Sequence, residues 1–503
     1  MSLAMKLNLP HIKLSSLLAG IKGVPAIDDL SVSGLAIDSR NISAGDLFIA
    51  LPGTRQHGND YIEAAVSQGA VAVVYDTDSS LPESIDARVG DDVPLIKITN
   101  ITQRAGIIAS RFYGEPSRAM TVTGITGTNG KTTCSILLAQ SLNHLGARAS
   151  VIGTLGTGLW GEIRSSTHTT PDSVTLQRQI SDLRGLGADQ LLMEVSSHGL
   201  QQGRESGTEF NTAVFTNLSQ DHLDYHGSMQ QYGAAKARLF YQNDLNLAVI
   251  NVDDEFGREL LAGPVKAEQI ISYGIESGDV RASQITLHKA GIKLDIHSLW
   301  GELHIDSSLM GRFNVYNLLA CAAVLLADGY RAGDVASALS VAESAAGRME
   351  CFVSQGVTVV VDFAHTPDAL QQVLIALREH IQARRLICVF GCGGDRDQAK
   401  RPIMGRIAEQ LADTVIITDD NPRDEDPAQI RAEILAGMSR PAQEISDRRQ
   451  AINAAWQYAN PGDIILLAGK GHETTQQTGD LKLPFSDREV VMALFSEIAG
   501  GQA

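Results

Sequence analysis

The feature that most constrains the fold is a repeated alternation of short β-branched segments with longer segments of helical spacing. Each β-branched segment ends in a turn rich in Gly, Ser, Asn or Asp, and a helix-sized stretch follows it. This order is typical of α/β units, in which helices connect parallel strands. The 503 residues are enough for about three domains at roughly 150 residues per domain.

The alternation restarts twice, which predicts three α/β domains. They are a small N-terminal domain over residues 1–98, a central domain with a mostly parallel sheet over 99–346, and a Rossmann-like C-terminal domain over 347–503. The predicted strands are 34–40, 46–51, 70–76, 119–126, 191–197, 212–219, 247–254, 357–363, 385–390, 413–418 and 463–469. The predicted helices include 61–69, 102–112, 134–146 and a helix after Asn314 that closes the central domain.

Composition excludes several classes of partner and compartment. The 41 Lys and Arg against 58 Asp and Glu give a formal charge of −17, which opposes broad binding to nucleic acid or anionic lipid. The five cysteines lack the paired spacing of a zinc site and are typical of a reducing compartment. No apolar run approaches the ~20 residues of a membrane span, and the first residues lack the order of a signal peptide. We therefore expect a cytoplasmic protein.

The strongest local motif is a glycine-rich loop between a predicted strand and a predicted helix. Such a loop wraps its backbone N–H groups around a phosphate, Lys131 supplies a charge to the β and γ oxygens, and the Thr132 hydroxyl can ligate Mg²⁺. The strict pattern requires Gly where this chain has Ile125, so the loop is a variant. The alternative is a glycine-rich turn with an exposed lysine. The loop consists of Gly127, Thr128, Asn129, Gly130, Lys131, Thr132 and Thr133.

Two further residues are candidates for a metal site. Glu194 ends an apolar strand, where a carboxylate commonly ligates Mg²⁺; the alternative is a helix cap or a surface acid. His222, in the segment NLSQDHLDYHG, is a candidate ligand, although a hydrogen-bonded structural histidine fits the spacing equally well.

Seven motifs in this order resemble those of the Mur ligases, and the resemblance runs over essentially the whole chain. The motifs are TGTNGKTT, EVSSHGL, TNLSQDHLDYHG followed by GAAKARL, GRFNVYN, GRME, DFAHTPDAL and DNPR. The resemblance implies a UDP-binding domain, a central ATPase domain and a C-terminal domain that receives an amino acid. We also expect a monomer that binds small-molecule substrates and no nucleic acid.

The implied activity is the ATP-dependent addition of meso-diaminopimelate to UDP-N-acetylmuramoyl-L-alanyl-D-glutamate, a step of peptidoglycan precursor synthesis. A carboxylate and an amine do not condense at neutral pH, so the carboxylate first takes the γ-phosphoryl group of ATP. The amine then attacks the acyl phosphate and expels phosphate. Both steps move negative charge, which Mg²⁺ and Lys131 would stabilise.

The resemblance assigns metal and ATP contacts. Thr132 and Glu194 would hold one Mg²⁺, and His222 with a carbamylated Lys236 would serve a second. Without the resemblance, Lys236 is a solvated surface lysine, Asn317 a helix cap and Asp362 a turn residue. The implied ATP contacts outside the loop are Asn317, Arg348, Asp362 and His365.

The resemblance also assigns both remaining substrates. The UDP-linked peptide would contact Ile37, Ser39, Thr54, Arg55, Gln56, Thr169, Thr170, Ser196, Gln202 and Arg204. Diaminopimelate differs from lysine by a second carboxylate, which a guanidinium binds with two parallel hydrogen bonds. Its contacts would be Arg396, Asp420, Asn421, Pro422, Arg423, Gly469 and Glu473, although DNPR taken alone could be a surface loop. GCGG is not a dinucleotide fingerprint, because Arg396 stands where a third glycine is required.

Three alternatives remain. The first is a Mur ligase for another amino acid such as lysine, and the second is a folylpolyglutamate-type ligase with the same ATPase core. DNPR and the N-terminal module count against both. The third is a nucleotide switch or motor; the guanine-binding N-K-x-D motif is absent from the sequence, and the charge of −17 disfavours a helicase.

Overall fold

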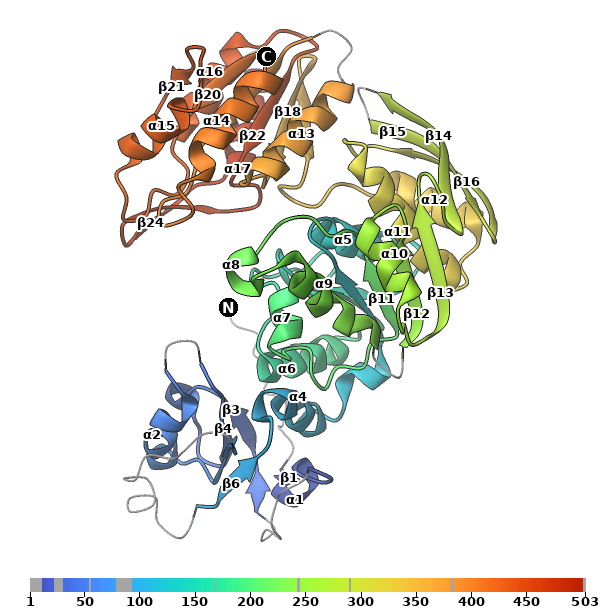
Figure 1. Cartoon of the computed structure of the whole chain (residues 1–503), viewed down its shortest axis with the longest axis vertical. Helices are drawn as coiled ribbons and strands as arrows, with labels where there is room; N and C mark the ends of the chain where they lie inside the picture. Colours follow the sequence, from blue (N-terminus) through green and yellow to red (C-terminus); the bar gives the residue numbers. More distant parts are fainter. Residues whose placement is uncertain are drawn as a thin grey trace. The chain divides into compact units, whose positions relative to one another are not determined.

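The computed structural model describes residues 11–21, 30–53, 56–77, 93–166, 168–241, 245–288, 291–380 and 384–500 (Figure 1). The chain forms two compact units. The first contains Met1–Lys131, Gly146–Ile250 and Asp254–Ile270, and the second contains Thr132–Leu145, Asn251–Asp253 and Ile271–Ala503. In the described part of the chain, no helix is both long enough and apolar enough to cross a bilayer.

The N-terminal part of the first unit is a parallel sheet of order β3-β4-β5-β6. Strand β4 is buried along its length because both faces of the sheet are covered: Leu47 and Ile49 belong to one apolar cluster, and Phe48 and Ala50 to another. The bounds are β3 Gly34–Ala36, β4 Asp46–Ala50, β5 Ala72–Asp76, β6 Leu95–Ile98, α2 Ile62–Ser67 and α4 Ile101–Phe112, with the small elements β1 Ile12–Lys13, β2 Ser31–Val32 and α1 Leu14–Leu17.

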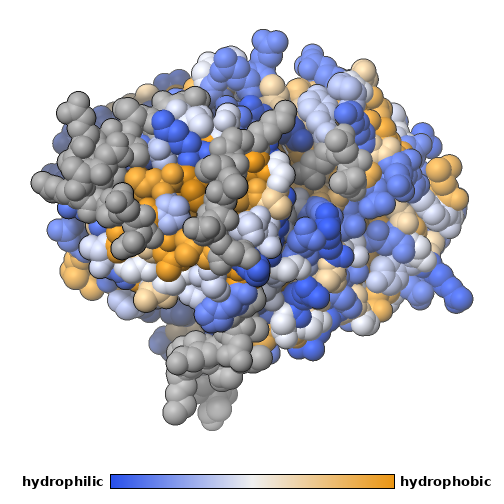
Figure 2. Space-filling view, turned by 90° about the horizontal axis from the view of Figure 1, so that it is seen from below, coloured by the Kyte–Doolittle hydropathy of each residue, from blue (hydrophilic) through white to orange (hydrophobic). Residues whose placement is uncertain are grey.

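The strand predicted over 34–40 is shorter than expected. It ends at Ala36, because Asp38 caps the 3₁₀ helix η1 (Ser39–Asn41) by accepting the N–H of Arg40. A second 3₁₀ helix, η2 (Gly58–Tyr61), precedes α2. Figure 2 shows the molecule from below, with one continuous apolar area and a mixture of hydrophilic and apolar side chains elsewhere.

The central sheet of the first unit places three loops at one edge. Its order is β12-β11-β7-β10-β8-β9, parallel except for β9. Because β7, β10 and β11 are parallel neighbours, the loops after them lie side by side. The bounds are β7 Thr121–Thr126, β8 Ala149–Gly153, β9 Gly156–Leu159, β10 Gln190–Glu194, β11 Thr212–Phe215 and β12 Leu245–Asn251, with η3 Pro116–Ala119, α6 Ser173–Gly185, α7 Ser197–Gln201, α8 Leu223–His226, α9 Met229–Ala237, η4 Arg238–Tyr241 and α10 Glu255–Ala262.

The sequence pattern did not predict four strands, of which β14, β15, β16 and the second half of β13 belong to the second unit. They have the order β16-β15-β14-β13, and β14, β15 and β16 pair antiparallel. The bounds are β13 Ala267–Gly274, β14 Val280–His288, β15 Gly291–Ser298 and β16 Gly301–Ser307. The helices of this region are α5 Lys131–His144, α11 Phe313–Ala327 and α12 Ala332–Val341.

The C-terminal sheet is doubly wound, with helices on both faces. In β22, Leu466 packs with α13, α14 and α15, whereas Ile465 and Leu467 pack with α16 and α17. The order β17-β18-β22-β19-β20-β21 is parallel except for β17 (Figure 1). The bounds are β17 Glu350–Ser354, β18 Val357–Asp362, β19 Leu386–Phe390, β20 Thr414–Ile417, β21 Gln443–Glu444, β22 Ile464–Ala468, α13 Pro367–His380, α14 Lys400–Leu411, α15 Pro427–Leu435, α16 Arg448–Tyr458 and α17 Asp487–Gly500, and the hairpin β23 Thr475–Thr478 with β24 Leu481–Pro484. The predicted α/β class is confirmed.

Candidate active site

The glycine-rich loop lies between β7 and α5, as the sequence predicts, and its glycines have positive φ. Gly127 has φ +151°, and a Cβ there would lie 1.8 Å from Thr216 Oγ1, so no larger residue fits. The loop is fixed to the segment after β11, because Thr128 N–H donates to the Asn217 carbonyl (2.8 Å) and Asn129 N–H to Asn217 Oδ1 (3.0 Å). Gly130, φ +87°, ends the loop before the helix begins at Lys131.

Lys131 is partly buried and folds back on its own loop. Its Nζ donates to the carbonyls of Gly127 and Thr128, both at 2.8 Å. Thr132, one residue further, is buried. The alternative of an exposed lysine on a glycine-rich turn is therefore wrong.

Lys236, on α9, is buried against the same loop. Its side chain is 1 % exposed, and its Nζ donates to the Gly127 carbonyl (2.7 Å) and lies 4.3 Å from the centre of the Tyr232 ring. Burial, with the Lys131 charge adding to it, lowers the pKa of the Lys236 ammonium well below its usual range. The interpretation as a solvated surface lysine is wrong. A lower pKa raises the share of neutral amine, which is the form that reacts with CO₂.

Glu194 is the last residue of β10 and is 1 % exposed, which rules out a surface acid. Its carboxylate accepts the N–H of Thr154 (2.8 Å) and the Thr154 hydroxyl (3.0 Å). A Cβ at Gly153 would lie 2.2 Å from Glu194 Oε1, so the glycine makes room for the carboxylate. The site thus holds a buried acid at the edge of the sheet where the phosphate loop begins.

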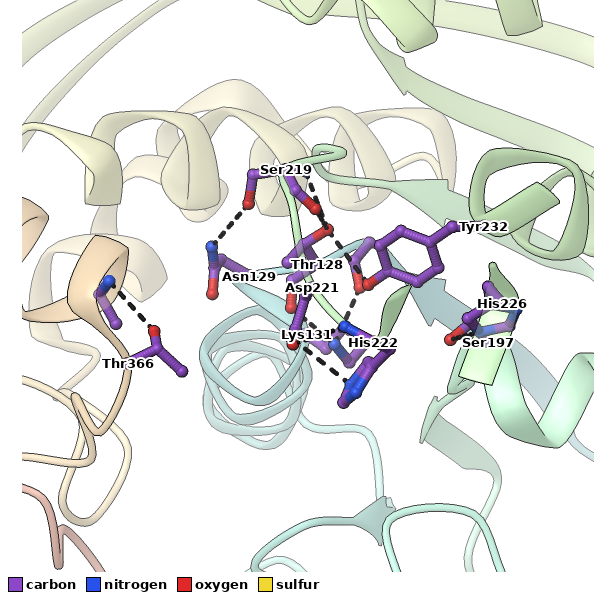
Figure 3. Close-up of polar contacts among 12 residues, drawn as sticks. Thr128, Asn129, Lys131, Ser197, Ser219, Asp221, His222, His226, Tyr232 and Thr366 are labelled. Atoms are coloured by element: carbon purple, nitrogen blue, oxygen red, sulfur yellow. Dashed lines mark hydrogen bonds and ion pairs between the residues drawn. The ribbon is translucent and has the colours of Figure 1, made fainter. Parts of the chain in front are cut away.

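His222 belongs to an aromatic cluster beside the loop (Figure 3). It precedes α8 with φ +53°, and its Nε2 lies 3.4 Å from Asp221 Oδ2. The ring centres of His198 and Tyr232 lie 4.8 and 6.2 Å from that of His222. Tyr232 also bonds Thr128, with 3.2 Å between the two hydroxyl oxygens.

Sequence reasoning missed His198, His226 and Tyr232. The i, i+4 spacing of His222 and His226 in DHLDYHG was the available signal, but His198 reaches the cluster only through the fold. Burial, with His222 and His226 adding to it, lowers the pKa of His198 to about 4. Within the described ranges, His, Cys, Asp and Glu alone form no group of three or more suited to a metal ion.

The residues predicted to bind the UDP-linked peptide in the central domain form one hydrogen-bonded network next to Glu194. The Thr170 hydroxyl donates to the Glu194 carbonyl (3.0 Å) and accepts the N–H of Ser196 (3.1 Å). Arg204 donates to the Thr170 carbonyl (2.8 Å) and to Gln202 Oε1 (2.8 Å).

The other predicted contacts of this substrate are placed elsewhere or outside the described residues. Thr169 meets the Thr154 hydroxyl at 3.0 Å. Ile37 follows β3, Ser39 lies in η1 and Gln56 precedes η2, all in the N-terminal part of the first unit, and Gln56 accepts the Tyr61 hydroxyl. Thr54 and Arg55 lie outside the residues that the structure describes.

Three of the predicted ATP contacts of the second unit surround or adjoin Phe363. The Arg348 guanidinium lies 4.8 Å from the Phe363 ring, and the His365 ring centre lies 4.6 Å from it. Asp362 accepts the N–H groups of Met349 (2.7 Å) and Ala364 (2.8 Å), and burial raises the pKa of its carboxyl. His472, 5.2 Å from the same ring, was not predicted.

Asn317 lies within α11 rather than at its end, so the helix-cap alternative is wrong. Its side-chain amide donates to Asn314 Oδ1 at 2.7 Å. Its Oδ1 accepts the Cys134 thiol of α5 at 3.4 Å. Asn317 thus connects α11 to the helix that follows the glycine-rich loop.

Six of the seven predicted diaminopimelate contacts follow β20 or β22, and the seventh, Arg396, follows β19. Asp420, Asn421 and Pro422 are buried, so the surface-loop interpretation is wrong. Asn421 donates to Glu473 (2.8 Å) and accepts the ammonium of Lys470 (3.2 Å), a fully buried residue that sequence reasoning missed.

The two arginines predicted to bind diaminopimelate differ in their exposure to solvent. Arg423 is half-buried and donates to the Gly394 carbonyl (2.6 Å), whereas Arg396 is exposed. Gly469 has φ +112°, and a Cβ there would lie 2.8 Å from Asp420 Oδ2. The carboxylate of Asp420 therefore requires a glycine at this position.

Three family descriptions match successive parts of the chain. They are "Mur ligase family, catalytic domain" over residues 31–113, "Mur ligase middle domain" over 125–325 and "Mur ligase, glutamate ligase domain" over 347–471. The chain belongs to the Mur ligase family. These matches have the order of the three predicted domains, while the boundaries at 98/99 and 346/347 stay a prediction.

Curated relatives share nearly half of the sequence with this Mur ligase. The UDP-N-acetylmuramoyl-L-alanyl-D-glutamate--2,6-diaminopimelate ligase of Chromobacterium violaceum is 46 % identical over 465 residues, covering 92 % of this chain and 94 % of the relative. The enzyme of the same name from Pseudomonas aeruginosa is 47 % identical over 469 residues, with 92 and 94 % covered.

Solved structures agree with this assignment. One of a ligase with the same name has a TM-score of 0.73 at 34 % identity, covering 97 % of this chain and all of that one. A folylpolyglutamate synthase of Mycobacterium tuberculosis, at 21 % identity and a TM-score of 0.60 over 72 % of this chain and 91 % of that one, shares the fold alone.

Proposed function

We propose that this Mur ligase adds meso-diaminopimelate to UDP-N-acetylmuramoyl-L-alanyl-D-glutamate, with ATP converted to ADP and phosphate. The observation that carries the proposal is the identity of 46–47 % over more than nine tenths of the chain to ligases of that name. The loop at residues 127–133, the Thr170 network and the cluster around Asn421 supply, in turn, groups suited to phosphate, to a peptide carboxylate and to an amino acid.

The chemistry needs charge stabilisation and positioning rather than a covalent enzyme nucleophile. The carboxylate of the D-glutamyl residue attacks the γ-phosphorus of ATP, and ADP leaves. The amine of diaminopimelate then attacks the acyl carbon, loses a proton, and phosphate departs. Lys131 stabilises the oxygens of the phosphoryl group. The N–H groups of Thr128 and Asn129 bond Asn217, so the loop N–H groups from Gly130 onward orient these oxygens.

We propose that Thr132, Glu194, His222 and a carbamylated Lys236 hold Mg²⁺. Bound Mg²⁺ would neutralise charge on the phosphate oxygens. The buried acid and the depressed amine pKa of Lys236 fit this role, because carbamylation replaces a cation with an anionic carbamate. We further propose that Asn317, Arg348, Asp362 and His365 bind the nucleoside part of ATP.

For the other substrates, the proposal uses the residues already placed. Ile37, Ser39, Gln56, Thr169, Thr170, Ser196, Gln202 and Arg204, with Thr54 and Arg55, bind the UDP-linked peptide. Arg423 binds the distal carboxylate of diaminopimelate, assisted by Arg396, Asp420, Asn421, Pro422, Gly469 and Glu473. We also propose that the protein is a cytoplasmic monomer and that it binds no nucleic acid. The charge of −17 favours the absence of nucleic-acid binding.

The test measures ATP turnover with each substrate omitted in turn. We expect phosphate release only when the UDP-linked dipeptide and diaminopimelate are both present, and a loss of roughly a hundredfold or more in Lys131→Ala. Turnover without the amino acid would favour a nucleotide switch instead.

The amino-acid preference separates a diaminopimelate ligase from a Mur ligase that adds lysine. L-Lysine lacks the distal carboxylate and leaves Arg423 unpaired, so we expect selectivity for diaminopimelate on the order of a thousandfold. Equal use of lysine would refute the specificity and leave the ligase activity standing.

A further inference from the structure

The backbone of Arg423 is in a conformation that L-residues rarely adopt. Its φ is +53°, in the left-handed region, where a non-glycine residue is strained. Such a conformation persists only when neighbouring groups hold it. The direction of the guanidinium depends on this backbone, so whatever holds it also sets the position of the charge.

The hairpin of β23 and β24 supplies the groups that hold Arg423. The Arg423 N–H donates to the Gln477 carbonyl (3.1 Å), and the Gly479 N–H donates to the Arg423 carbonyl (2.6 Å). Both backbone groups of the strained residue therefore bond to the hairpin, and Arg423 extends it as a parallel bridge to Thr478.

A side chain of the hairpin attaches it to the preceding residues of the same loop. Gln476 Nε2 donates to the Asp420 carbonyl (2.7 Å) and to the Asp419 carbonyl (3.4 Å). The next residue contributes its backbone, since Gln477 N–H donates to Asn421 Oδ1 (3.0 Å). The loop over residues 419–423 is thus bonded to one hairpin at several points along its length.

The hairpin has little apolar packing of its own. All four residues of β24 are exposed, including Leu481 (59 %) and Leu483 (53 %). An isolated two-stranded hairpin is marginally stable in water, so its bonds to the 419–423 loop order both segments together.

We propose that Gln476 is a positioning residue for amino-acid specificity. By fixing the hairpin to the 419–423 loop, it holds Arg423 in the left-handed conformation that aims its guanidinium at the distal carboxylate. The identity of the amino acid in this inference rests on the proposed function. The link between the hairpin and the loop does not depend on that function.

The test uses two variants and a matched control. Gln476→Ala removes both side-chain bonds, whereas Gln476→Glu keeps the shape but places a carboxylate against two carbonyl oxygens. Thr475→Ala, on the same strand with an exposed side chain, is the control. We expect kcat/KM for diaminopimelate to fall about tenfold in Gln476→Ala and further in Gln476→Glu. The KM for ATP should stay within about twofold, and Thr475→Ala should resemble the wild type.

Amide hydrogen exchange provides a readout that needs no substrate. In Gln476→Ala, peptides covering residues 419–423 should exchange faster than in the wild type, while the peptides of α5 should not change. Unchanged exchange at 419–423, or wild-type use of diaminopimelate by Gln476→Glu, would overturn the inference. If the wild type did not ligate diaminopimelate, the proposed function would fail, and the exchange measurement would still decide the link between hairpin and loop.

Discussion

At the scale of single residues, Lys236 gives the sharpest test of the metal site. We expect Lys236→Ala to be nearly inactive, because it removes the amine that becomes a carbamate. Acetate or formate should partly restore activity, since a small carboxylate can occupy the vacated volume and supply hard oxygen ligands. The measurement is ligation rate against carboxylate concentration, with Lys131→Ala as a control that the same anions should not rescue. Full activity of Lys236→Ala without added anion would contradict an essential role.

Glu205 is a partly buried acid, with a buried Oε2, that the proposed mechanism does not use. Burial raises the pKa of its carboxyl to about 7, and among the described residues no hydrogen-bond partner reaches its Oε2. The folded chain therefore holds a proton there at pH values where the unfolded chain has lost it. Between the usual carboxyl range and pH 7, the free energy of unfolding consequently falls as pH rises.

We expect Glu205→Gln to remove this penalty. The variant should be more stable than the wild type by up to about 3 kcal/mol above pH 7, and the difference should vanish near pH 4. Urea denaturation at pH 5 and pH 8 measures it, with Glu268→Gln, at an exposed acid, as the control. An equal difference at both pH values would contradict the burial argument.

The role of a residue could be predicted from the sequence when it depends on neighbours in the sequence, and not when it depends on residues that only the fold brings close. Lys131 and Glu194 lie in or beside short motifs whose strand and turn context is visible in the sequence. Lys236, by contrast, looked like a surface lysine because its burial comes from Tyr232 and Gly127, the latter more than a hundred residues away. His198 and Lys470 were missed for the same reason. Only a resemblance carried over the whole chain could assign such positions.

At the scale of elements, buried parallel strands were predictable and antiparallel ones were not. Strands β10 and β22 carry continuous apolar runs bounded by turns, which is the signal of a strand covered on both faces. Strand β14 reads VRASQITLH and alternates polar with apolar residues across a register shift between Ser283 and Thr286. The alternation is itself a strand signal, which sequence reasoning missed because the register shift interrupts it.

The turn before β17 offers a prediction at this scale. Gly347 has φ +65°, and a Cβ there would lie 2.1 Å from the backbone of Gly471 and His472. We expect Gly347→Ala to displace the turn that carries Arg348, to lower the free energy of unfolding by ~3 kcal/mol or more, and to raise the KM for ATP.

A matched control separates backbone strain from the clash. Gly329 has φ +90° with nothing within 4 Å of an added methyl group, so Gly329→Ala should cost only about 1 kcal/mol. Urea denaturation and ATP kinetics of both variants are the measurements. Equal effects in the two would show that the close approach to residues 471–472 has no importance.

At the scale of the whole molecule, the chain forms two compact units with separate apolar cores. Chains of this kind commonly depart from two-state unfolding. We therefore expect calorimetry to show more than one transition, with a calorimetric enthalpy above the van't Hoff value. A single transition with equal enthalpies would contradict independent units.

A buried ion pair identifies which transition belongs to the second unit. Arg448 and Asp487 are both 0 % exposed, and the guanidinium donates to both carboxylate oxygens at 2.7 Å. Arg448→Met leaves the carboxylate buried without its partner, at a cost of about 3–5 kcal/mol. It should lower one transition only, whereas Arg40→Met, at an exposed pair with Asp38 in the first unit, should shift neither.

The position of Lys131 has a consequence for which molecules the loop accepts. Its ammonium already donates hydrogen bonds to two carbonyl oxygens of the loop. An incoming ligand must therefore replace these bonds in order to bind the ammonium. An ionised phosphate oxygen is a stronger acceptor than a neutral carbonyl and makes that exchange favourable. A nucleoside or another neutral molecule offers no such gain. The loop therefore selects for ligands that carry an anionic oxygen, whatever their shape.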